Sequence, residues 1–188
     1  MKIIDLVKRP KITTNLDYNQ IPIDITEYKV RLQIDDEIKP FNNYNYNFMG
    51  CDPGTSKLGL AAWFFNTGYI YVWEIKMERQ PNTEERMNTF LSLLDYFTGG
   101  QRMKYVTVEG AGYMSSQYRQ VELEDIRASF VCWKHSSPET ILNIVPPNSI
   151  RKVVFGSAKI KNPWEWEGIP DNASAALACA LYPIMKEE

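Results

Sequence analysis

Two short apolar runs in this chain each end in an acidic residue, and this pattern restricts the possible folds more than any other feature. Asp52 follows the run 47–51 and precedes a Pro-Gly turn, and Glu109 follows the run 105–108. A carboxylate at the end of a buried strand is costly to desolvate unless it is paired or binds a cation. A third acid, Asp171, opens the last apolar helix. We therefore expect the three acids to converge at one end of a sheet.

The order of the predicted elements indicates a mixed α/β fold. Apolar and alternating runs predict three antiparallel strands, then helix, strand, helix, strand and helix, so that helices flank a mixed sheet. The predicted strands cover residues 47–51, 58–65, 69–76, 105–108 and 140–145. The predicted helices run from Pro81 to the glycine pair 99–100, over 116–133 and over 171–182.

The N-terminal part of the chain has a different composition. The first 46 residues contain three prolines and equal numbers of basic and acidic residues, seven of each. The alternation over 28–34 predicts one strand there. We interpret residues 1–45 as an N-terminal extension that packs on the domain, with an arm that reaches a partner as the alternative. Residues 46–188 then form the domain itself.

Composition limits the class of protein. At 188 residues with 44% hydrophobic content the chain can build one ordinary core, and its net charge of −2 gives no overall signal for nucleic-acid binding. Cys51, Cys132 and Cys179 form no CxxC pair, which predicts buried, reduced thiols. No apolar run approaches the roughly 20 residues of a membrane span, and no signal peptide opens the chain. These features predict a cytoplasmic protein with no membrane partner.

The three acids predict a metal site. Carboxylate oxygens are the ligands that Mg²⁺ and Mn²⁺ prefer, and two such ions about 4 Å apart can activate water for attack on a phosphodiester. Taken singly, Asp52 also suits an ordinary turn and Asp171 an ordinary helix cap. Glu109 suits neither role, because turn and cap chemistry do not call for Glu after an apolar strand. The joint arrangement favours metal binding.

Four motifs resemble those of RuvC-type Holliday junction resolvases, in the same order over about residues 46–183. The run 49–56, Met-Gly-Cys-Asp-Pro-Gly-Thr-Ser, resembles the first motif, and Val106 to Glu109 resembles the second. Residues 145–159 resemble the strand and basic stretch before the last helix. Asp171-Asn172-Ala173-Ser174-Ala175 resembles the closing Asp-x-Ala-Asp-Ala motif.

The resemblance implies a ribonuclease-H-like fold that acts as a homodimer and nicks four-way DNA junctions with Mg²⁺, for which Mn²⁺ can substitute. Asp52, Glu109 and Asp171 match three of the four catalytic, metal-binding acids. Ser174 departs from the pattern, because it stands at the fourth position and brings no charge. Either three acids suffice or another carboxylate substitutes, and the candidates for that role are Glu165 and Glu167.

Residues that could hold DNA lie near the predicted acids. The stretch 146–161 carries four cations and no acid, although such a cluster is also typical of a solvated face. Its cations are Arg151, Lys152, Lys159 and Lys161. Tyr113 stands near the place of the family's aromatic wedge, and packing over the dimer helix is the equal alternative. The helix 116–133 could form the dimer interface or be buried within one monomer.

Three other functions fit some of these features. A viral packaging nuclease or an RNA-processing nuclease would keep the fold and the acids and change the substrate. A non-catalytic junction-binding protein is compatible with Ser174. An actin-like ATPase would use the run 52–56 as a phosphate loop, but it needs a second domain and a second glycine-rich loop. Metal-dependent cleavage, junction preference and nucleotide binding separate these functions.

Overall fold

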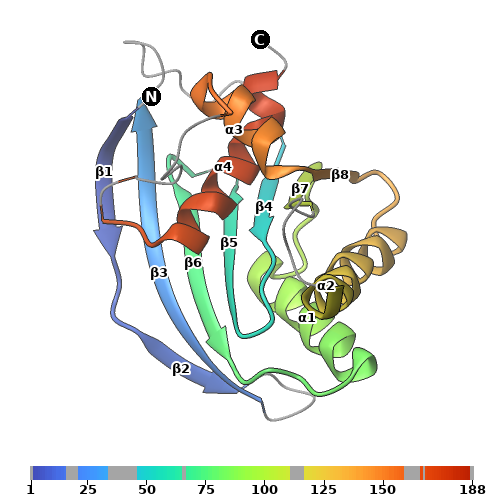
Figure 1. The fold of residues 1–188 in the computed structure, drawn as a ribbon. Helices are drawn as coiled ribbons and strands as arrows, with labels where there is room; N and C mark the ends of the chain where they lie inside the picture. Colours follow the sequence, from blue (N-terminus) through green and yellow to red (C-terminus); the bar gives the residue numbers. More distant parts are fainter. Residues whose placement is uncertain are drawn as a thin grey trace.

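The computed structural model describes residues 2–15, 21–33, 46–64, 67–110, 117–158, 166 and 168–186. In this part of the chain a mixed eight-stranded sheet lies between two layers of helices (Figure 1). The strand order is β1-β3-β6-β5-β4-β7-β8, and β2 also pairs with β3. The strands are β1 (Lys2–Lys8), β2 (Ile12–Asn15), β3 (Pro22–Gln33), β4 (Phe48–Asp52), β5 (Lys57–Trp63), β6 (Ile70–Met77), β7 (Tyr105–Glu109) and β8 (Ile141–Val145). The helices are α1 (Thr83–Thr98), α2 (Gln117–His135), α3 (Pro147–Phe155) and α4 (Asp171–Lys186).

Every element predicted after residue 46 is found, in the predicted order, and one further helix lies between β8 and α4. Strands β4, β5 and β6 are antiparallel, and β7 and β8 continue the sheet in parallel beside β4. Helix α3 was not predicted; it lies within the basic stretch that follows β8. Its sequence nevertheless carries two helix signals, Pro147 in the first turn and Gly156 in the left-handed conformation at its end.

The strand predicted over residues 28–34 is confirmed as part of β3, but the N-terminal segment contains two further strands, β1 and β2, that were not predicted. Strand β3 pairs along β6, while β1 and β2 pair in succession with β3, so the described part of residues 1–45 belongs to the same sheet. The alternation changes phase within β3, because Ile23 and Ile25 face one side whereas Tyr28 and Val30 face the other. The alternation of apolar and polar residues in the sequence is therefore interrupted between Ile25 and Tyr28, although the strand itself continues. The boundary between residues 45 and 46 stays a prediction.

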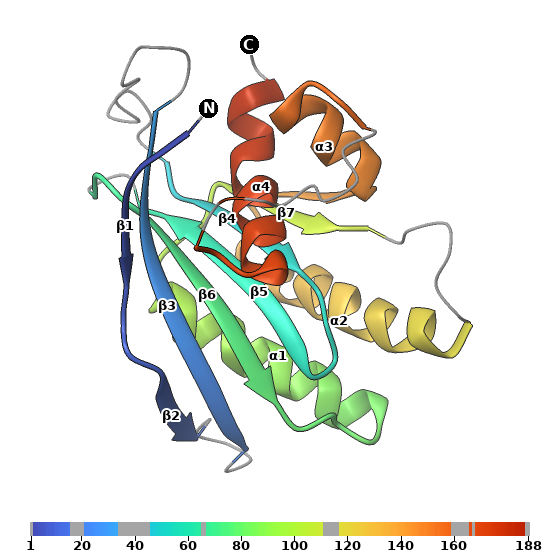
Figure 2. The ribbon, with the colours of Figure 1, turned by 60° about the vertical axis from the view of Figure 1, so that its left-hand side comes forward.

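The sheet separates two hydrophobic cores. Helices α3 and α4 cover one face, and α1 and α2 cover the other (Figure 2). Phe48, Trp63 and Leu177 belong to the core under α4. Phe90 and Phe130 belong to the core under α1 and α2. Because side chains alternate along each strand, β4 and β5 contribute to both cores.

Helix α4 lies unusually close to the sheet because two glycines face it. A Cβ atom at Gly50 would lie 2.1 Å from the Ala176 carbonyl oxygen and 2.2 Å from the Ala180 nitrogen. A Cβ atom at Gly59 would lie 2.0 Å from the carbonyl oxygen of Asn172. These contacts involve backbone atoms that cannot rotate away, so any larger residue would force the helix off the sheet.

The cysteines do not all lie in the core. Cys51 and Cys179 are buried, as predicted, whereas Cys132 is exposed. Cys132 faces outward because Phe130 and Trp133 occupy the inner face of α2. All three are free thiols. Among the described helices none is long and apolar enough to cross a membrane.

We expect Gly50→Ala to destabilise the protein by at least about 2 kcal/mol, because the added methyl group overlaps the α4 backbone. Thermal unfolding followed by circular dichroism measures the effect. Gly68→Ala is the control, since its Cβ would meet only the end of the Arg31 side chain, 3.4 Å away. Equal melting temperatures for the two variants would contradict the close contact.

Candidate metal and nucleic-acid site

Asp52 and Glu109 end two neighbouring parallel strands. The register pairs Gly50 with Thr107 and Cys51 with Val108, so the two acids are next in line at the carboxyl ends of β4 and β7. Adjacent strands lie about 4.8 Å apart. Both acids share the face that α4 covers, because the Gly50 Cβ direction points into that helix and side chains two residues apart share a face. The fold therefore brings these two predicted acids side by side.

Asp171 reaches the same edge through the first turn of α4. Asn172 donates a hydrogen bond from Nδ2 to the carbonyl oxygen of Lys57, at 3.1 Å. The carbonyl oxygen of Asn172 also contacts Gly59, which lies directly opposite Asp52 in the β4–β5 ladder. These contacts fix the start of α4 over the strand next to Asp52. Asp171 itself is exposed there, at the helix N-terminus.

Glu109 lies in an environment that disfavours its charge. Its Oε2 atom is buried and has no hydrogen-bond partner among the described residues. Burial raises the pKa of the Glu109 carboxyl to about 7, and the positive charges of Arg151 and Arg127 oppose that rise. Arg127, which is 4% exposed, donates from Nε to the Glu109 carbonyl oxygen at 3.2 Å. The two arginines therefore only partly compensate a buried carboxylate.

The charges of Asp52 and Glu109 also affect the pKa values of two buried thiols, Cys51 and Cys179. Burial raises the pKa of the Cys51 and Cys179 thiols, and the carboxylates of Asp52 and Glu109 raise it further. Both thiols consequently stay protonated at neutral pH. Both thiols are buried and neutral, so neither offers a charge that would compensate the two acids.

Ser174, at the predicted fourth position, is fully buried. Its hydroxyl donates a hydrogen bond to the Ile169 carbonyl oxygen at 3.2 Å, and its backbone nitrogen donates to the Pro170 carbonyl oxygen at 2.9 Å. The hydroxyl proton is therefore used to close the first turn of α4. A role for Ser174 toward a metal stays a prediction.

Two of the five predicted DNA-binding residues fall in the described part of the chain. Arg151 is half-buried on α3, and its charge acts directly on Glu109. Lys152 is exposed on the same helix. The other predicted residues lie outside the described residues, as do the candidate substitute acids; they are Lys159, Lys161, Tyr113, Glu165 and Glu167.

Three basic residues near this edge were missed from the sequence. Arg127 lies on the buried face of α2 beside Ile126 and Phe130, where a cation in an apolar pattern is itself a signal. Lys57 and Lys76 lie at the same end of β5 and β6 and share the face of the acids. Their signal is weaker, because lysine at a strand end is usually solvated surface.

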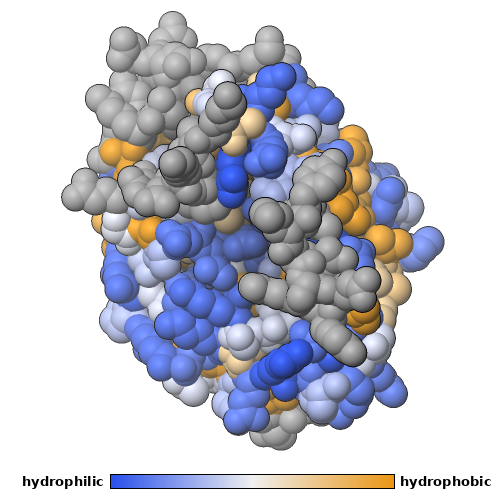
Figure 3. Space-filling model, viewed as in Figure 1, coloured by the Kyte–Doolittle hydropathy of each residue, from blue (hydrophilic) through white to orange (hydrophobic). Residues whose placement is uncertain are grey.

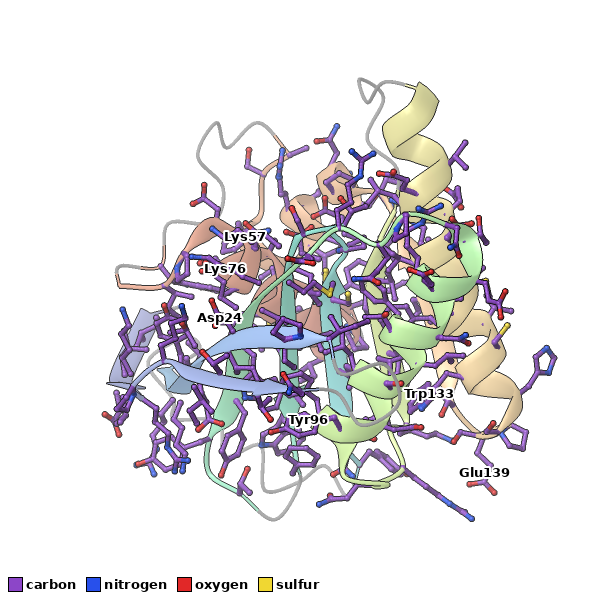
Figure 4. The ribbon with its side chains drawn as sticks, turned by 90° about the horizontal axis from the view of Figure 1, so that it is seen from below. Asp24, Lys57, Lys76, Tyr96, Trp133 and Glu139 are labelled. Atoms are coloured by element: carbon purple, nitrogen blue, oxygen red, sulfur yellow. The ribbon has the colours of Figure 1, made fainter. Side chains whose placement is uncertain are left out.

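A cavity of about 520 Å³ lies at the other end of the sheet. Its lining comes from the segments that precede β4, β7 and β8, and it includes Asn47, Lys104 and Thr140. Figure 4 shows Glu139, also in its lining, on the opposite side of the molecule from Lys57. This cavity is separate from the three predicted acids.

Asp52 and Glu109 can offer oxygens to a divalent cation, but the expected convergence of all three acids on one ion is not found in the described residues. The described part of the chain contains no group of three His, Cys, Asp or Glu side chains placed to hold a metal ion. Mg²⁺ usually retains several waters and binds through one or two carboxylates together with substrate phosphates. The buried, unpartnered oxygen of Glu109 beside Asp52 supplies such a donor set.

Comparison with solved structures identifies the fold. The chain is similar to a Thermus thermophilus RuvC structure, with a TM-score of 0.62 and 16% identity over 75% of this chain and 95% of that one. It is also similar to T. thermophilus RuvC in complex with a Holliday junction substrate, with a TM-score of 0.60, 14% identity and coverages of 76% and 94%. No family model and no curated protein matches the sequence. The chain therefore has the ribonuclease-H-like fold of RuvC.

We expect Glu109→Gln to stabilise the metal-free protein at pH 8 but not at pH 5. The folded-state pKa of about 7 lies above the ordinary value of 4.5, so this group's stabilising effect is complete below the ordinary value and is lost as the pH rises through 7. Glutamine mimics the protonated acid, and the gain at pH 8 should be on the order of 2 kcal/mol. Melting temperatures in EDTA at the two pH values measure it.

The control for this experiment is Glu139→Gln, whose side chain is 79% exposed at the other end of the sheet. It should change the melting temperature little at either pH. The same gain for Glu109→Gln at pH 5 and pH 8 would contradict the buried, charge-disfavouring environment of Glu109.

Proposed function

We propose that this protein is a Mg²⁺-dependent endonuclease that resolves four-way DNA junctions by paired nicks. The observation that carries the proposal is the pair of acids at neighbouring strand ends, one with a buried unpartnered oxygen, beside the first turn of α4. The substrate is supported by the fold, since one structure of similar fold is RuvC bound to a Holliday junction. The resemblance of four sequence motifs to those of RuvC-type resolvases supports the same function.

In this proposal Asp52, Glu109 and Asp171 hold Mg²⁺ or Mn²⁺ together with phosphate oxygens and water. A bound ion would lower the pKa of the attacking water and stabilise the departing 3′ oxygen. The acids themselves supply negative charge at a site where burial makes an uncompensated carboxylate costly. Cation binding would relieve that cost.

The basic residues of α3 would hold the DNA backbone. Arg151 lies near Glu109, so a phosphate that it binds would lie beside the acid pair. Lys152, exposed on the same helix, would contact a neighbouring phosphate. We extend the role to Lys159 and Lys161 from the sequence alone, and Tyr113 stays a proposed wedge at the junction centre.

Cleavage of labelled synthetic DNA tests the proposal against its alternatives. A four-way junction and a linear duplex are incubated with Mg²⁺, with Mn²⁺ or with EDTA. Paired symmetric nicks on the junction alone, lost in EDTA, are expected. Equal cutting of both DNAs would indicate another nuclease of this fold, junction binding without cutting would indicate a binding protein, and nucleotide binding alone would favour an actin-like ATPase.

We expect Asp52→Asn to reduce junction cleavage by at least about a hundredfold while junction binding stays equal or becomes tighter, because the substitution removes negative charge near phosphate. Gel-based cleavage and fluorescence anisotropy measure the two effects. Asp95→Asn, on the exposed surface of α1, is the control. Full activity of Asp52→Asn would rule out the proposed metal site.

We further propose that the active form is a homodimer that contacts its partner through α2 and β8. Ile126, Phe130 and Trp133 of α2 are buried within the monomer, so only its outer face is available. Val121 on that face is 60% exposed, and Ile144 on β8, the last strand of the described sheet, is 46% exposed. Hydrophobic residues gather over β8 and α2 on the right of Figure 3. Two copies would give the paired active sites that symmetric nicking needs.

We expect Val121→Glu to shift the protein from dimer to monomer, because it places a charge in the proposed apolar contact. Size-exclusion chromatography with light scattering measures the mass. Val7→Glu, at an apolar residue of β1 that is 46% exposed, is the matched control and should leave the dimer intact. A dimer that tolerates Val121→Glu would place the interface elsewhere.

We place this activity in the cytoplasm. The three cysteines are free, which fits a compartment that keeps thiols reduced.

A further inference from the structure

A row of charged side chains crosses the sheet beside the acid pair. Lys57 of β5 lies directly opposite Lys76 of β6, which lies directly opposite Asp24 of β3. Figure 4 shows the three side chains one after another. The adjacent row on the same face contains Asp52, Gly59 and Glu74. The two lysines therefore lie one step further toward the carboxyl edge than Asp52.

Glu74 holds both lysines. Its side chain is only 7% exposed, and its two oxygens accept from Lys57 Nζ and Lys76 Nζ, each at 3.0 Å. Burial raises the pKa of Glu74, but the hydrogen bonds from the two lysines outweigh that effect and lower it overall. The carboxylate is thus ionised at neutral pH, and it fixes two long, flexible side chains in defined positions.

The two ammonium groups remain accessible. The Lys57 side chain is 41% exposed and that of Lys76 is 56% exposed. An ammonium group has three N–H donors, so a bond to Glu74 leaves donors on each lysine for a second acceptor. Two cations held by one carboxylate carry a net charge of +1, and an anion is the partner that this charge attracts.

Asp24 has a basic partner of its own. It is ion-paired with Lys11, whose Nζ lies 2.6 Å away, and it accepts a hydrogen bond from Thr13 at 2.7 Å. These contacts lower the pKa of Asp24. Lys11, directly before β2, forms the ion pair of Asp24, whereas Lys76 forms its ion pair with Glu74, although the Lys76 charge also acts on Asp24.

The lysine pair adjoins the proposed active site. The Lys57 carbonyl oxygen accepts the hydrogen bond from Asn172, next to Asp171. Since α4 begins above Gly59, it leaves the sheet face beyond that point uncovered by its own residues. Hydrophilic residues cover the face below the start of α4 in Figure 3. A strand that passes the acids could continue over this face.

We propose that Lys57 and Lys76, positioned by Glu74, bind phosphate oxygens of the DNA strand that passes the Asp52–Glu109 acid pair. The inference rests on the proposed function. It adds a phosphate-binding site on the opposite side of the acids from α3, so that the strand is held on both sides of the cleavage position. Glu74 acts as a positioning residue, because it contacts the lysines rather than the DNA.

Binding of a labelled four-way junction in EDTA tests this inference without cleavage. Fluorescence anisotropy at 50–300 mM salt is measured for the parent protein, Lys57→Gln, Lys76→Gln and Glu74→Gln. Lys57→Arg tests rescue by a conservative change. Lys186→Gln, at the far end of α4, is the matched control. Circular dichroism verifies that each variant is folded.

We expect Lys57→Gln and Lys76→Gln each to weaken binding about three- to tenfold and to reduce the slope of log K against log salt by about 0.9. Lys57→Arg should retain most of the affinity, and Lys186→Gln should behave as the parent. Glu74→Gln should weaken binding although it removes a negative charge; tighter binding would overturn its positioning role.

Two failures are distinguishable. If the parent binds the junction and both lysine variants bind equally well with the same salt slope, the lysine site is overturned and the proposed function stands. If the folded parent binds no junction DNA at any salt concentration, the proposed function fails and the lysine site fails with it.

Discussion

The contact between α4 and the sheet at Gly50 and Gly59 is the constraint on which the rest of this structure depends. Backbone atoms of Asn172, Ala176 and Ala180 occupy the space that side chains would fill on β4 and β5. This approach buries the alanine-rich face of α4 against the sheet and fixes where the helix begins. Because α4 begins over Gly59, Asp171 comes to the strand edge at which β4 and β7 end.

The edge of the sheet at which β4 and β7 end carries both acidic and basic side chains, and these differ in how deeply they are buried. Glu109 is partly buried and its charge is disfavoured, while Arg127 and Arg151 approach it from α2 and α3. Glu74, also buried, is instead fully engaged by two lysines. The positive charges near Glu109 therefore do not fully offset the cost of burying its carboxylate, whereas Glu74 has two cations for its single negative charge. Under the proposed function, a cation would bind at the first acid and a phosphate at the lysines of the second.

The N-terminal strands are part of this arrangement. Strand β3 lies along β6, and its Asp24 extends the row that begins with Lys57. Lys11, directly before β2, and Thr13 of β2 then contact Asp24. The segment that the sequence marks as an extension consequently contributes to the charged face beside the acids. The RuvC structures of similar fold match about three quarters of this chain. Experiments on the charged face therefore need this protein, including its N-terminal strands.

The sequence by itself determined the strands and helices after residue 46 other than α3, and the positions of the three acids at the ends of those elements. Local patterns suffice for this, because alternation, helical spacing and turn residues act over a few positions. It did not determine the strands of the N-terminal segment, where the apolar residues of β3 change face, and it missed α3 within a stretch noted for its charge.

Only the tertiary structure decided which groups meet. The pairing of β4 with β7 sets Asp52 beside Glu109, although 56 residues separate them in the chain. Burial then changes the pKa of Glu109, and the β5–β6 register brings Lys57 and Lys76 together on Glu74. Ser174 illustrates this limit, because its hydroxyl donates to the carbonyl oxygen of Ile169, two residues before α4 begins. Desolvation and long-range pairing depend on the whole packed chain, so no local pattern encodes them.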